Sequence, residues 1–345
     1  MDRLLFEIEE QPTVLEKVLN LEKKRINEVA KQILKNGIKH IYIAARGSSD
    51  NVAIYAKYVL GIRNNIPVGL AAPSIFTIYD SSVKLTDSLV VGISQSGQSP
   101  DVVSVIQNAS KQGCFTIAIT NKPDSPLGHI VDEVLFCNAG PELSVAATKT
   151  YSSQLFIIAM LSASLLGDKV YFRELKKLPC FLASMLEKSE LIKELAGELK
   201  GIDRCVTIGR GYNYCTAFEY ALKLKELTYI LAMPYSTSDF LHGPIAILRR
   251  DFPCLLIAPS GRVIGGFYNF SEKVRTREAM IVVVSDNEEI IKNSDFFIRM
   301  PTGIEEWLSP IVYSVSGQLL SYYLAKEKGI DPEQPIGLSK ITKTV

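Results

Sequence analysis

Residues 88–101 read SLVVGISQSGQSPD, and this stretch decides the fold. Its first six residues, 88–93, are typical of a strand that is buried on both faces. A loop of serine, glutamine and glycine follows at 94–99. Pro100 suits the first position of a helix that continues to Lys111. The stretch therefore predicts a strand–loop–helix unit of a parallel α/β sheet.

Similar strand signals recur along the chain. They lie at 40–45, 88–93, 115–120 and 133–138 in the first half, and at 204–209, 253–259, 280–285 and 295–300 in the second. Helical stretches such as 51–60 and 102–111 separate them. This alternation predicts an α/β fold, with mainly parallel sheets and helices on both faces.

Three landmarks indicate that the chain is a duplication. Gly37 pairs with Gly201, Arg46-Gly47 with Arg210-Gly211, and Ser96-Gly97 with Ser260-Gly261, always 164 residues apart. A shared offset of this kind predicts two copies of one domain. We expect N-terminal helices and the first copy at 1–169, a helical linker at 170–198, the second copy at 199–335 and a tail at 336–345.

Composition limits the class of protein. The chain has 345 residues, with 38 Lys and Arg against 37 Asp and Glu, and a net charge of +1. This balance excludes a strongly basic nucleic-acid binder and an acidic tail protein. The length favours two domains. A mean hydropathy of +0.14 leaves room for an apolar subunit interface.

The sequence also predicts the compartment. Residues 1–12 carry several acids and no apolar core, so we expect no signal peptide. The most apolar run, 155–167, is shorter than the ~20 residues that span a bilayer. None of the six cysteines has CxxC spacing, so we expect no zinc site and no disulfide framework. These features favour a cytoplasmic protein.

Two loops of the first copy carry side chains suited to an anion. Ser94, Ser96 and Ser99 precede a predicted helix, whose first N–H groups attract negative charge. Ser48 and Ser49 repeat this arrangement after the first predicted strand. Alternatively, these residues only form turns and helix caps. The second copy has RGYN and PSGR in the corresponding loops, so ligand chemistry is expected in the first copy.

The stretch SQSGQS at 94–99 resembles the phosphosugar loop of the sugar isomerase (SIS) domain family. From about residue 20 onward, the chain resembles members with two such domains: the isomerase half of glucosamine-6-phosphate synthase and the free-standing amino-sugar phosphate deaminases. The resemblance implies two tandem SIS domains and a phosphosugar ligand. It implies that the phosphate is held by Ser48, Ser49, Ser94, Gln95, Ser96 and Ser99.

Three charged residues share one face of a predicted helix. Glu219, Lys223 and Glu226 lie at positions i, i+4 and i+7. They form either a solvated row of ion pairs or a lysine–carboxylate pair that moves a proton between neighbouring sugar carbons. The resemblance favours the second interpretation. It matches Glu226 to the family's proton-shuttling glutamate and Lys223 to the lysine one turn before it.

The three histidines differ in their expected roles. His40 begins a strand and His129 follows a turn, so both are expected to be structural. His242 lies in a polar loop, and an imidazole can carry protons near neutral pH. The segment LHGP at 241–244 resembles the family's histidine motif. This implies that His242 opens the sugar ring, that it reaches the site of a neighbouring subunit, and that the protein is a homodimer.

The last eleven residues, 335–345, are either a frayed terminus or a functional tail. In the family a similar tail closes over the sugar, and the resemblance places Ser339 and Lys340 at the substrate. A lysine there can contact an open-chain carbonyl or form an imine with it. Lys343 is a less suitable substitute.

The segment after the fourth strand also resembles the family. There the backbone around Val145 touches the sugar. Glu142 belongs to this segment, and it equally suits a charge at a helix N-terminus.

The chain departs from the synthase in two respects. Arg46 stands where the synthase has a cysteine. Only a short segment that begins Met1-Asp2 precedes the first copy, so we expect no glutamine-hydrolysing domain and no internal source of ammonia. The RGSS and SQSGQSPD forms look more like the deaminases and deglycases.

The expected reaction converts an amino-sugar phosphate, such as glucosamine 6-phosphate, to fructose 6-phosphate and ammonia. Neither a metal nor an organic cofactor is expected. Two alternatives remain. One is a deglycase that acts on a fructosamine 6-phosphate. The other is a non-catalytic phosphosugar sensor, although the sequence offers no room for a DNA-binding helix-turn-helix and no basic patch.

Overall fold

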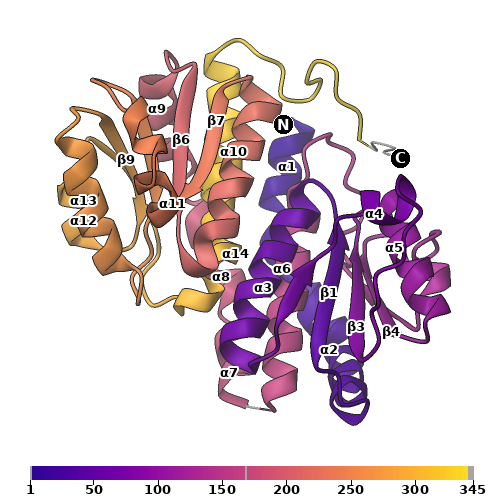
Figure 1. Ribbon diagram of the computed structural model, residues 1–345. Coiled ribbons are helices and arrows are strands. Elements are labelled where there is room, and N and C mark those ends of the chain that lie inside the picture. The colour runs from indigo at the N-terminus through magenta and orange to yellow at the C-terminus, as the bar shows by residue number, and fades with distance from the viewer. Residues whose placement is uncertain (1, 168, 341–345) are drawn as a thin grey trace. The chain divides into compact units, whose positions relative to one another are not determined.

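The computed structural model describes residues 2–167 and 169–340 (Figure 1). Contacts divide the chain into two compact units. The first unit comprises 10–143, 149–179 and the tail from Ser339, and the second comprises 2–9, 144–148 and 180–338. Among the described residues, no helix has the length and apolar character needed to cross a membrane.

Each unit contains one parallel sheet of five strands. The first sheet consists of β1 (His40–Ala45), β2 (Val68–Leu70), β3 (Ser88–Ile93), β4 (Phe115–Thr120) and β5 (Glu133–Phe136), in the order β2-β1-β3-β4-β5. The second consists of β6 (Arg204–Gly209), β7 (Leu231–Ser236), β8 (Pro253–Ile257), β9 (Met280–Ser285) and β10 (Phe296–Arg299), in the order β10-β9-β8-β6-β7. Counted from the start of each half, both sheets have the same strand order. This confirms two tandem copies of one α/β domain.

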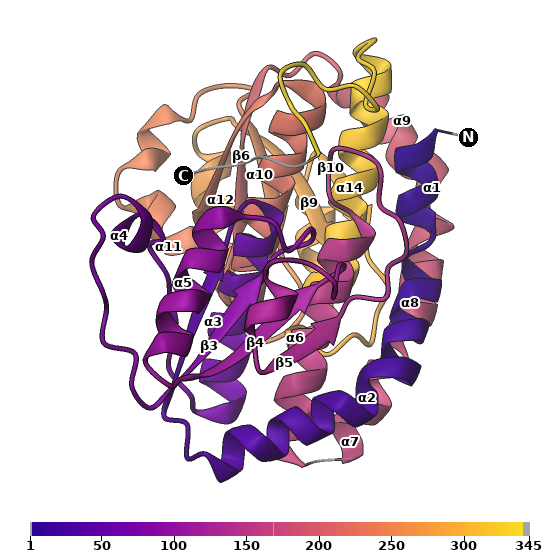
Figure 2. The same ribbon diagram turned by 90° about the vertical axis from the view of Figure 1, so that its right-hand side faces the viewer.

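Helices cover both faces of each sheet. The helices are α1 (Arg3–Glu9), α2 (Gln11–Lys35), α3 (Ser48–Asn64), α4 (Ser74–Thr77), α5 (Pro100–Lys111), α6 (Lys149–Leu166), α7 (Lys169–Leu175), α8 (Leu178–Leu186), α9 (Ser189–Leu199), α10 (Tyr214–Thr228), α11 (Thr237–Leu241), α12 (Ile264–Arg275), α13 (Glu288–Lys292) and α14 (Ser309–Glu327). Four single 3₁₀ turns complete the described structure, η1 (Gly128–Ile130), η2 (Gly211–Asn213), η3 (Pro244–Ile247) and η4 (Glu306–Leu308). In the first unit α6 packs against α2 and α3 (Figure 2).

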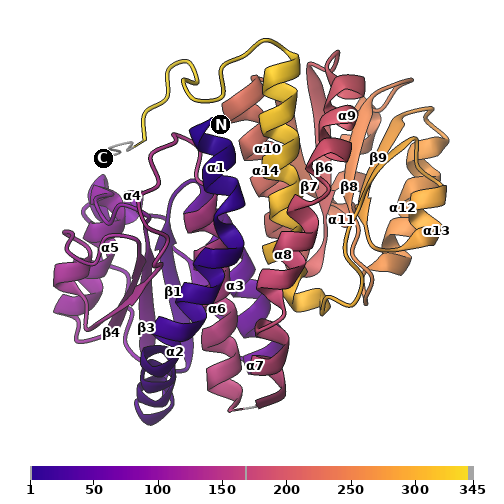
Figure 3. The ribbon, with the colours of Figure 1, turned by 180° about the vertical axis from the view of Figure 1, so that it is seen from behind.

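The alternation of side chains along the strands explains these layers. Val90 and Ala118 point into a core with Val105 and Ile106 of α5, and the neighbouring residues of the same strands point to the opposite face. In the second unit, α12 and α13 pack on one face of the sheet, and α9, α10 and α14 lie on the other side (Figure 3). The apolar run that includes 155–163 is a fully buried stretch of α6.

The edge strands β2 and β7 were not predicted. β2 has only three residues, and β7 contains Pro234, which cannot donate to a ladder and is typical of an edge strand. The predicted helix 51–60 is longer in the structure, because α3 spans Ser48–Asn64. The segment 170–198, predicted as a helical linker, contains most of α7 together with α8 and α9, and the two units divide inside α8, between Pro179 and Cys180.

The paired glycines occupy equivalent junctions. Gly47 follows β1 with a φ of 56°, and Gly211 follows β6 with a φ of 60°. Gly97 follows β3 with a φ of 62°, and Gly261 follows β8 with a φ of 141°. A positive φ favours glycine at each of these turns. These two landmark pairs thus mark the same strand–helix junctions in both copies.

Candidate active site

The residues predicted to bind phosphate follow β1 and β3, at the carboxyl end of the first sheet where the strand order reverses. β1 and β3 are neighbours, with Ala45 opposite Ile93 at their carboxyl ends. Beyond β1 the sheet continues with β2, and beyond β3 it continues with β4. Ligands of open α/β sheets bind at such a switch point. The loops after β1 and β3 therefore occupy the position at which a ligand is expected.

The loop after β3 folds back on itself. The hydroxyl oxygens of Ser94 and Ser99 are 3.3 Å apart, and Ser94 Oγ accepts a hydrogen bond from Gly97 N at 3.1 Å. A Cβ atom on Gly97 would lie 2.0 Å from Ser125 Oγ, so only glycine fits there. Ser96 Oγ accepts from the N–H of Gln98 at 3.3 Å. The serines are thereby gathered next to the first turn of α5.

The start of α5 combines a helix N-terminus with an ion pair whose acid is buried. Ser99 is the N-cap residue and Pro100 begins the helix, as predicted, but the Ser99 hydroxyl accepts no capping hydrogen bond. Asp101 follows, fully buried, and pairs with the guanidinium of Arg46. The arginine neutralises an acid that would otherwise repel an anion at this turn. It also ties the loop after β1 to α5.

The two serines after β1 have different surroundings. Both belong to the first turn of α3, whose N-cap is Gly47. The hydroxyl of Ser49 is buried and donates to Gln154 Oε1 of α6 at 3.1 Å, whereas Ser48 is partly exposed. Ser49 thus helps to fix α3 against α6. Gln154, Asp101 and the role of Arg46 were not found from the sequence, although an acid directly after a proline at a helix start was an available signal for Asp101.

Lys340, the last described residue, forms an ion pair with Glu142. Its Nζ lies 2.8 Å from Glu142 Oε2. Glu142 also accepts from Thr150 N at 3.0 Å and from Thr150 Oγ1 at 2.7 Å, in the first turn of α6. Burial alone would raise the pKa of Glu142, but Lys340 and the bonds from Thr150 outweigh it and hold that pKa below the ordinary value. The proposed charge at a helix start is therefore present, and the tail lysine is bound to it.

Two other predicted residues of this region are placed as follows. Val145 belongs to the second unit and is partly buried. It follows Ser144, whose N–H lies 3.3 Å from a carboxylate oxygen of Glu7 in α1. Ser339 belongs to the first unit with Lys340. Lys343 lies outside the described residues.

Two of the three predicted charged residues of α10, Glu219 and Lys223, are buried and the third, Glu226, is partly buried, so the interpretation as a solvated row of ion pairs is wrong. Lys223 Nζ lies 3.5 Å from Glu219 Oε1 and 2.5 Å from Glu226 Oε2. The side chains of Lys223 and Glu219 are 1% exposed, and that of Glu226 is 24% exposed. A buried ammonium requires such partners. Two carboxylates share one ammonium, and Glu226 is the one that reaches the surface, where it can exchange a proton with a ligand.

His242 is exposed at the end of α11. Its backbone N–H donates to Asp239 O at 3.1 Å, and Gly243 follows with a φ of 128°. Within residues 2–167 and 169–340, the structure shows no hydrogen bond or ion pair to the His242 ring. Of the other histidines, His40 begins β1, and His129 bonds to Asp124 at 2.7 Å.

In the second copy, a carboxylate of the protein lies at the corresponding switch point. Glu306 Oε2 accepts from Arg262 N at 2.7 Å. An added Cβ on Gly261 would lie 2.2 Å from the same oxygen, and one on Gly211 would lie 4.0 Å from Glu306 Oε1. Ser260 N donates to Asp286 Oδ1 at 2.7 Å. In the second copy, the loop after β8, which corresponds to the loop at 94–99, is thus bonded to Glu306 and Asp286. Glu306 also lies near Gly211, in the loop that corresponds to the one after β1.

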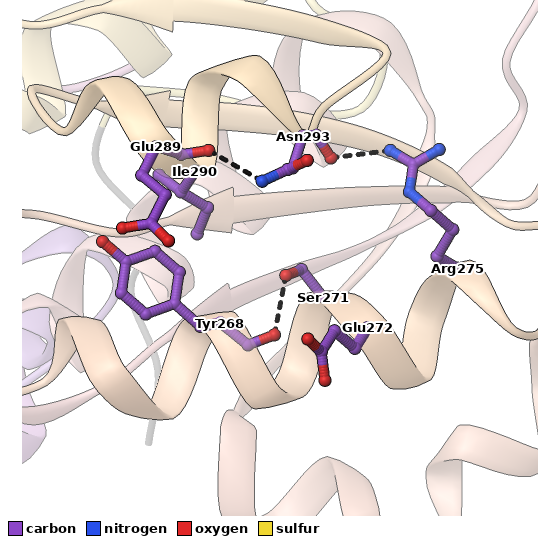
Figure 4. Close-up of a pocket in the computed structure, with 7 residues that line it drawn as sticks. All are labelled: Tyr268, Ser271, Glu272, Arg275, Glu289, Ile290 and Asn293. Atoms are coloured by element: carbon purple, nitrogen blue, oxygen red, sulfur yellow. Dashed lines mark hydrogen bonds between the residues drawn. The ribbon is translucent and has the colours of Figure 1, made fainter.

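A surface pocket of about 230 Å³ lies between α12 and α13 (Figure 4). It is lined by Tyr268, Ser271, Glu272, Arg275, Glu289, Ile290 and Asn293. Several of its polar groups bond to one another, such as Arg275 to the Asn293 carbonyl at 2.6 Å. None of the predicted site residues lines this pocket.

Comparison with known proteins identifies relatives over nearly the whole chain. The chain is 37% identical over 347 residues to glutamine–fructose-6-phosphate aminotransferase (isomerizing) of Thermococcus kodakarensis, and the match covers 98% of this chain and 57% of that protein. It is 32% identical to the protein of the same name from Escherichia coli, covering 97% of this chain and 57% of that protein. The chain thus spans little more than half the length of these relatives.

A solved structure shows the same architecture. The C-terminal domain of glucosamine-fructose-6-phosphate aminotransferase from Francisella tularensis superposes with a TM-score of 0.86 at 27% identity, covering 97% of this chain and 98% of that one. The family model described as SIS domain matches residues 36–164 and again residues 198–327. Since the two matches coincide with the two parallel sheets, the chain belongs to the SIS domain family and carries two copies of that domain.

Proposed function

We propose that this protein is a phosphosugar isomerase of the deaminating type, which converts an amino-sugar phosphate such as glucosamine 6-phosphate to fructose 6-phosphate and ammonia. The observation that carries the proposal is Lys223, buried between Glu219 and Glu226. A ligand-binding module needs the hydroxyl loops but has no use for a carboxylate that moves a proton. The relatives named isomerizing aminotransferases favour the same class of chemistry.

In the proposed reaction the serine loops of the first copy hold the phosphate. The donors are the hydroxyls of Ser48, Ser94, Ser96 and Ser99, the side chain of Gln95 and the N–H groups at the start of α5. Ser49, whose hydroxyl donates to Gln154, is proposed to contribute through its backbone at the start of α3. Hydrogen bonds to a charged group are worth about 1.5–3 kcal/mol each. Such a set fixes the sugar by its least reactive end and leaves the carbonyl end free for chemistry.

The proton transfer is assigned to Glu226. His242 opens the ring, which exposes the C1 aldehyde. Glu226 removes the proton from C2 and returns it to C1, while a second proton passes from the C2 amine to O1. The C2–H and N–H bonds break, C1–H and O1–H bonds form, and the amino aldehyde becomes a C2 imine with an alcohol at C1. Water adds to the imine, ammonia leaves and the ketone remains. Lys223 holds the Glu226 carboxylate in place, and Lys340 contacts the carbonyl end.

We further propose a cytoplasmic homodimer in which His242 acts in the neighbouring subunit. The exposed position of the His242 ring supports this arrangement, because a catalytic imidazole needs an orienting contact that a second chain can provide. Val145, through its backbone, and Ser339 are also proposed to contact the sugar.

The decisive experiment measures ammonia and fructose 6-phosphate from a panel of amino-sugar and fructosamine phosphates. Glu226→Gln keeps the size of the side chain but removes the base, so turnover should fall by about 10²–10⁴-fold while phosphosugar binding persists. Exchange of the C2 hydrogen with deuterated solvent should vanish in parallel. Glu198→Gln, the same change at an exposed site on α9, should leave both unchanged.

Two results would replace the proposed function with one of its alternatives. Release of an amine from fructosamine phosphates, with no ammonia from amino-sugar phosphates, would identify a deglycase. Tight phosphosugar binding by the wild-type chain, with neither ammonia release nor C2 exchange, would identify a sensor.

A further inference from the structure

The tail is held by a contact between residues that are far apart in the sequence. Lys340 and Glu142 are separated by 198 positions, yet their side chains lie 2.8 Å apart. The lysine side chain is 23% exposed and the carboxylate is fully buried. A buried carboxylate requires a partner of opposite charge or several hydrogen bonds. The contact therefore favours the docked tail over one that is free in solvent.

Two hydrogen bonds from Thr150 fix the orientation of the Glu142 carboxylate independently of Lys340. Oε1 accepts from Thr150 N, and Oε2 accepts from Thr150 Oγ1. Both bonds come from the start of α6, a long helix whose first fifteen residues are buried. The carboxylate is thus oriented by the rigid part of the unit. Lys340 binds to a group that is already in place.

A chain of hydrogen bonds connects Glu142 to the loop that carries the serines. The N–H of Asn121 donates to the carbonyl of Gln95 at 3.1 Å. The Asn121 side chain accepts from Ala139 N at 3.1 Å and donates to Gly140 O at 2.7 Å. Glu142 follows two residues later. The loops after β3, β4 and β5 are therefore bonded in sequence along one edge of the first sheet.

We propose that Glu142 is the positioning residue of the tail, and that it holds Lys340 at the same sheet edge as the serine loop. The catalytic part of this proposal rests on the proposed function, because it assumes that Lys340 serves the carbonyl end of a sugar whose phosphate lies on that loop. The docking part does not. The experiments below test the two parts separately.

Docking is tested by trypsin cleavage after Lys340, followed by mass spectrometry of the intact chain. Glu142→Gln can still accept from Thr150 but has no charge for the lysine, so cleavage should become about tenfold faster. Glu22→Gln is the matched control. Glu22 is another buried carboxylate, which bonds to Phe136 N and Asn138 Nδ2 without a lysine. Its cleavage rate should equal that of the wild type.

Two further variants keep the docking test decisive. Lys340→Arg retains a cation and a trypsin site, so it should remain protected, and Glu142→Gln in this background should again expose the site. Glu142→Asp keeps the charge on a shorter side chain and should give an intermediate rate. If Glu142→Gln and Glu142→Asp are both cleaved at the wild-type rate, Glu142 does not hold the tail.

The catalytic part is tested by a double-mutant cycle of Glu142→Gln and Lys340→Met on kcat/KM. Each single variant should lose about 10- to 100-fold. The double variant should be no worse than Lys340→Met alone, because Glu142 acts through Lys340. Losses that multiply would overturn the positioning role. If no variant or wild-type protein shows turnover but the trypsin result holds, the proposed function fails and the docking role stands.

Discussion

The guanidinium of Arg46 pairs with the carboxylate of Asp101, so the residue directly after β1 is joined to the first turn of α5. Arg46 is half exposed and Asp101 is buried. In the switch point of the first sheet, this pair connects the two helix starts between which a phosphate is proposed to bind. Arg46, which stands where the synthase has a cysteine, thus has a structural role in the candidate site.

Arg46→Met should destabilise the protein and weaken phosphate binding together. It leaves a buried carboxylate without its cation, which should lower the free energy of unfolding by about 1–3 kcal/mol. Urea unfolding and titration with inorganic phosphate measure the two effects. Arg25→Met is the control, since it removes a partly exposed pair with Glu133 that should be worth at most about 1 kcal/mol. Equal losses in both variants would contradict this account.

Gly97→Ala should abolish phosphate binding. The added methyl group would lie 2.0 Å from Ser125 Oγ, so the loop must move. Gly113→Ala is a matched control, because Gly113 also has a positive φ, of 74°, but an added Cβ there meets nothing within 4 Å. Both variants should lose about 1 kcal/mol of stability from backbone strain. Only Gly97→Ala should lose the ligand, and retained phosphate affinity in that variant would argue against the loop.

Mixed dimers should reveal the origin of His242. Chains with Glu226→Gln and chains with His242→Ala should each be inactive. If the histidine comes from the partner, each mixed dimer contains one intact site, and random exchange should restore about a quarter of the wild-type activity. A mass-spectrometric check of subunit exchange completes the measurement. Exchange without recovered activity would place His242 in its own subunit's site.

The free energy of unfolding at acidic pH should depend on Glu142. Because its pKa in the folded protein lies below the ordinary value of 4.5, the carboxylate stabilises the fold above that pH. This stabilisation is lost as the pH falls through the folded pKa. Glu142→Gln does not titrate, so the difference in unfolding free energy between wild type and variant should shrink below pH 4.5. Urea unfolding from pH 6 to pH 3 measures it. A constant difference would contradict the ion pair.

Sequence patterns predicted those parts of the fold that depend on residues close together in the chain. Eight strands, the duplication and the start of α5 at Pro100 follow from apolar runs, glycine spacing and helix-cap chemistry. The edge strands β2 and β7 were missed because a three-residue strand and a strand with Pro234 give weak signals. Their existence is decided by the neighbouring strand β1 or β6.

The candidate site was predictable in its residue types but not in its contacts. Helical spacing placed Lys223 and Glu226 on one face, but it could not show that this face is buried. The partner of Lys340 is 198 residues away, and no local pattern indicates such a pairing. The bond from Ser49 to Gln154 was hidden for the same reason. Long-range partners are set by the tertiary fold.

The position of the Glu306 carboxylate predicts how many phosphosugar molecules one chain binds. It accepts from Arg262 N and lies beside both Gly211 and Gly261, in the second copy's counterpart of the serine loops. The second copy therefore holds a carboxylate of its own chain at the position where the first copy is proposed to bind a phosphate. A titration should accordingly saturate at a single phosphosugar per polypeptide, although the architecture is twofold.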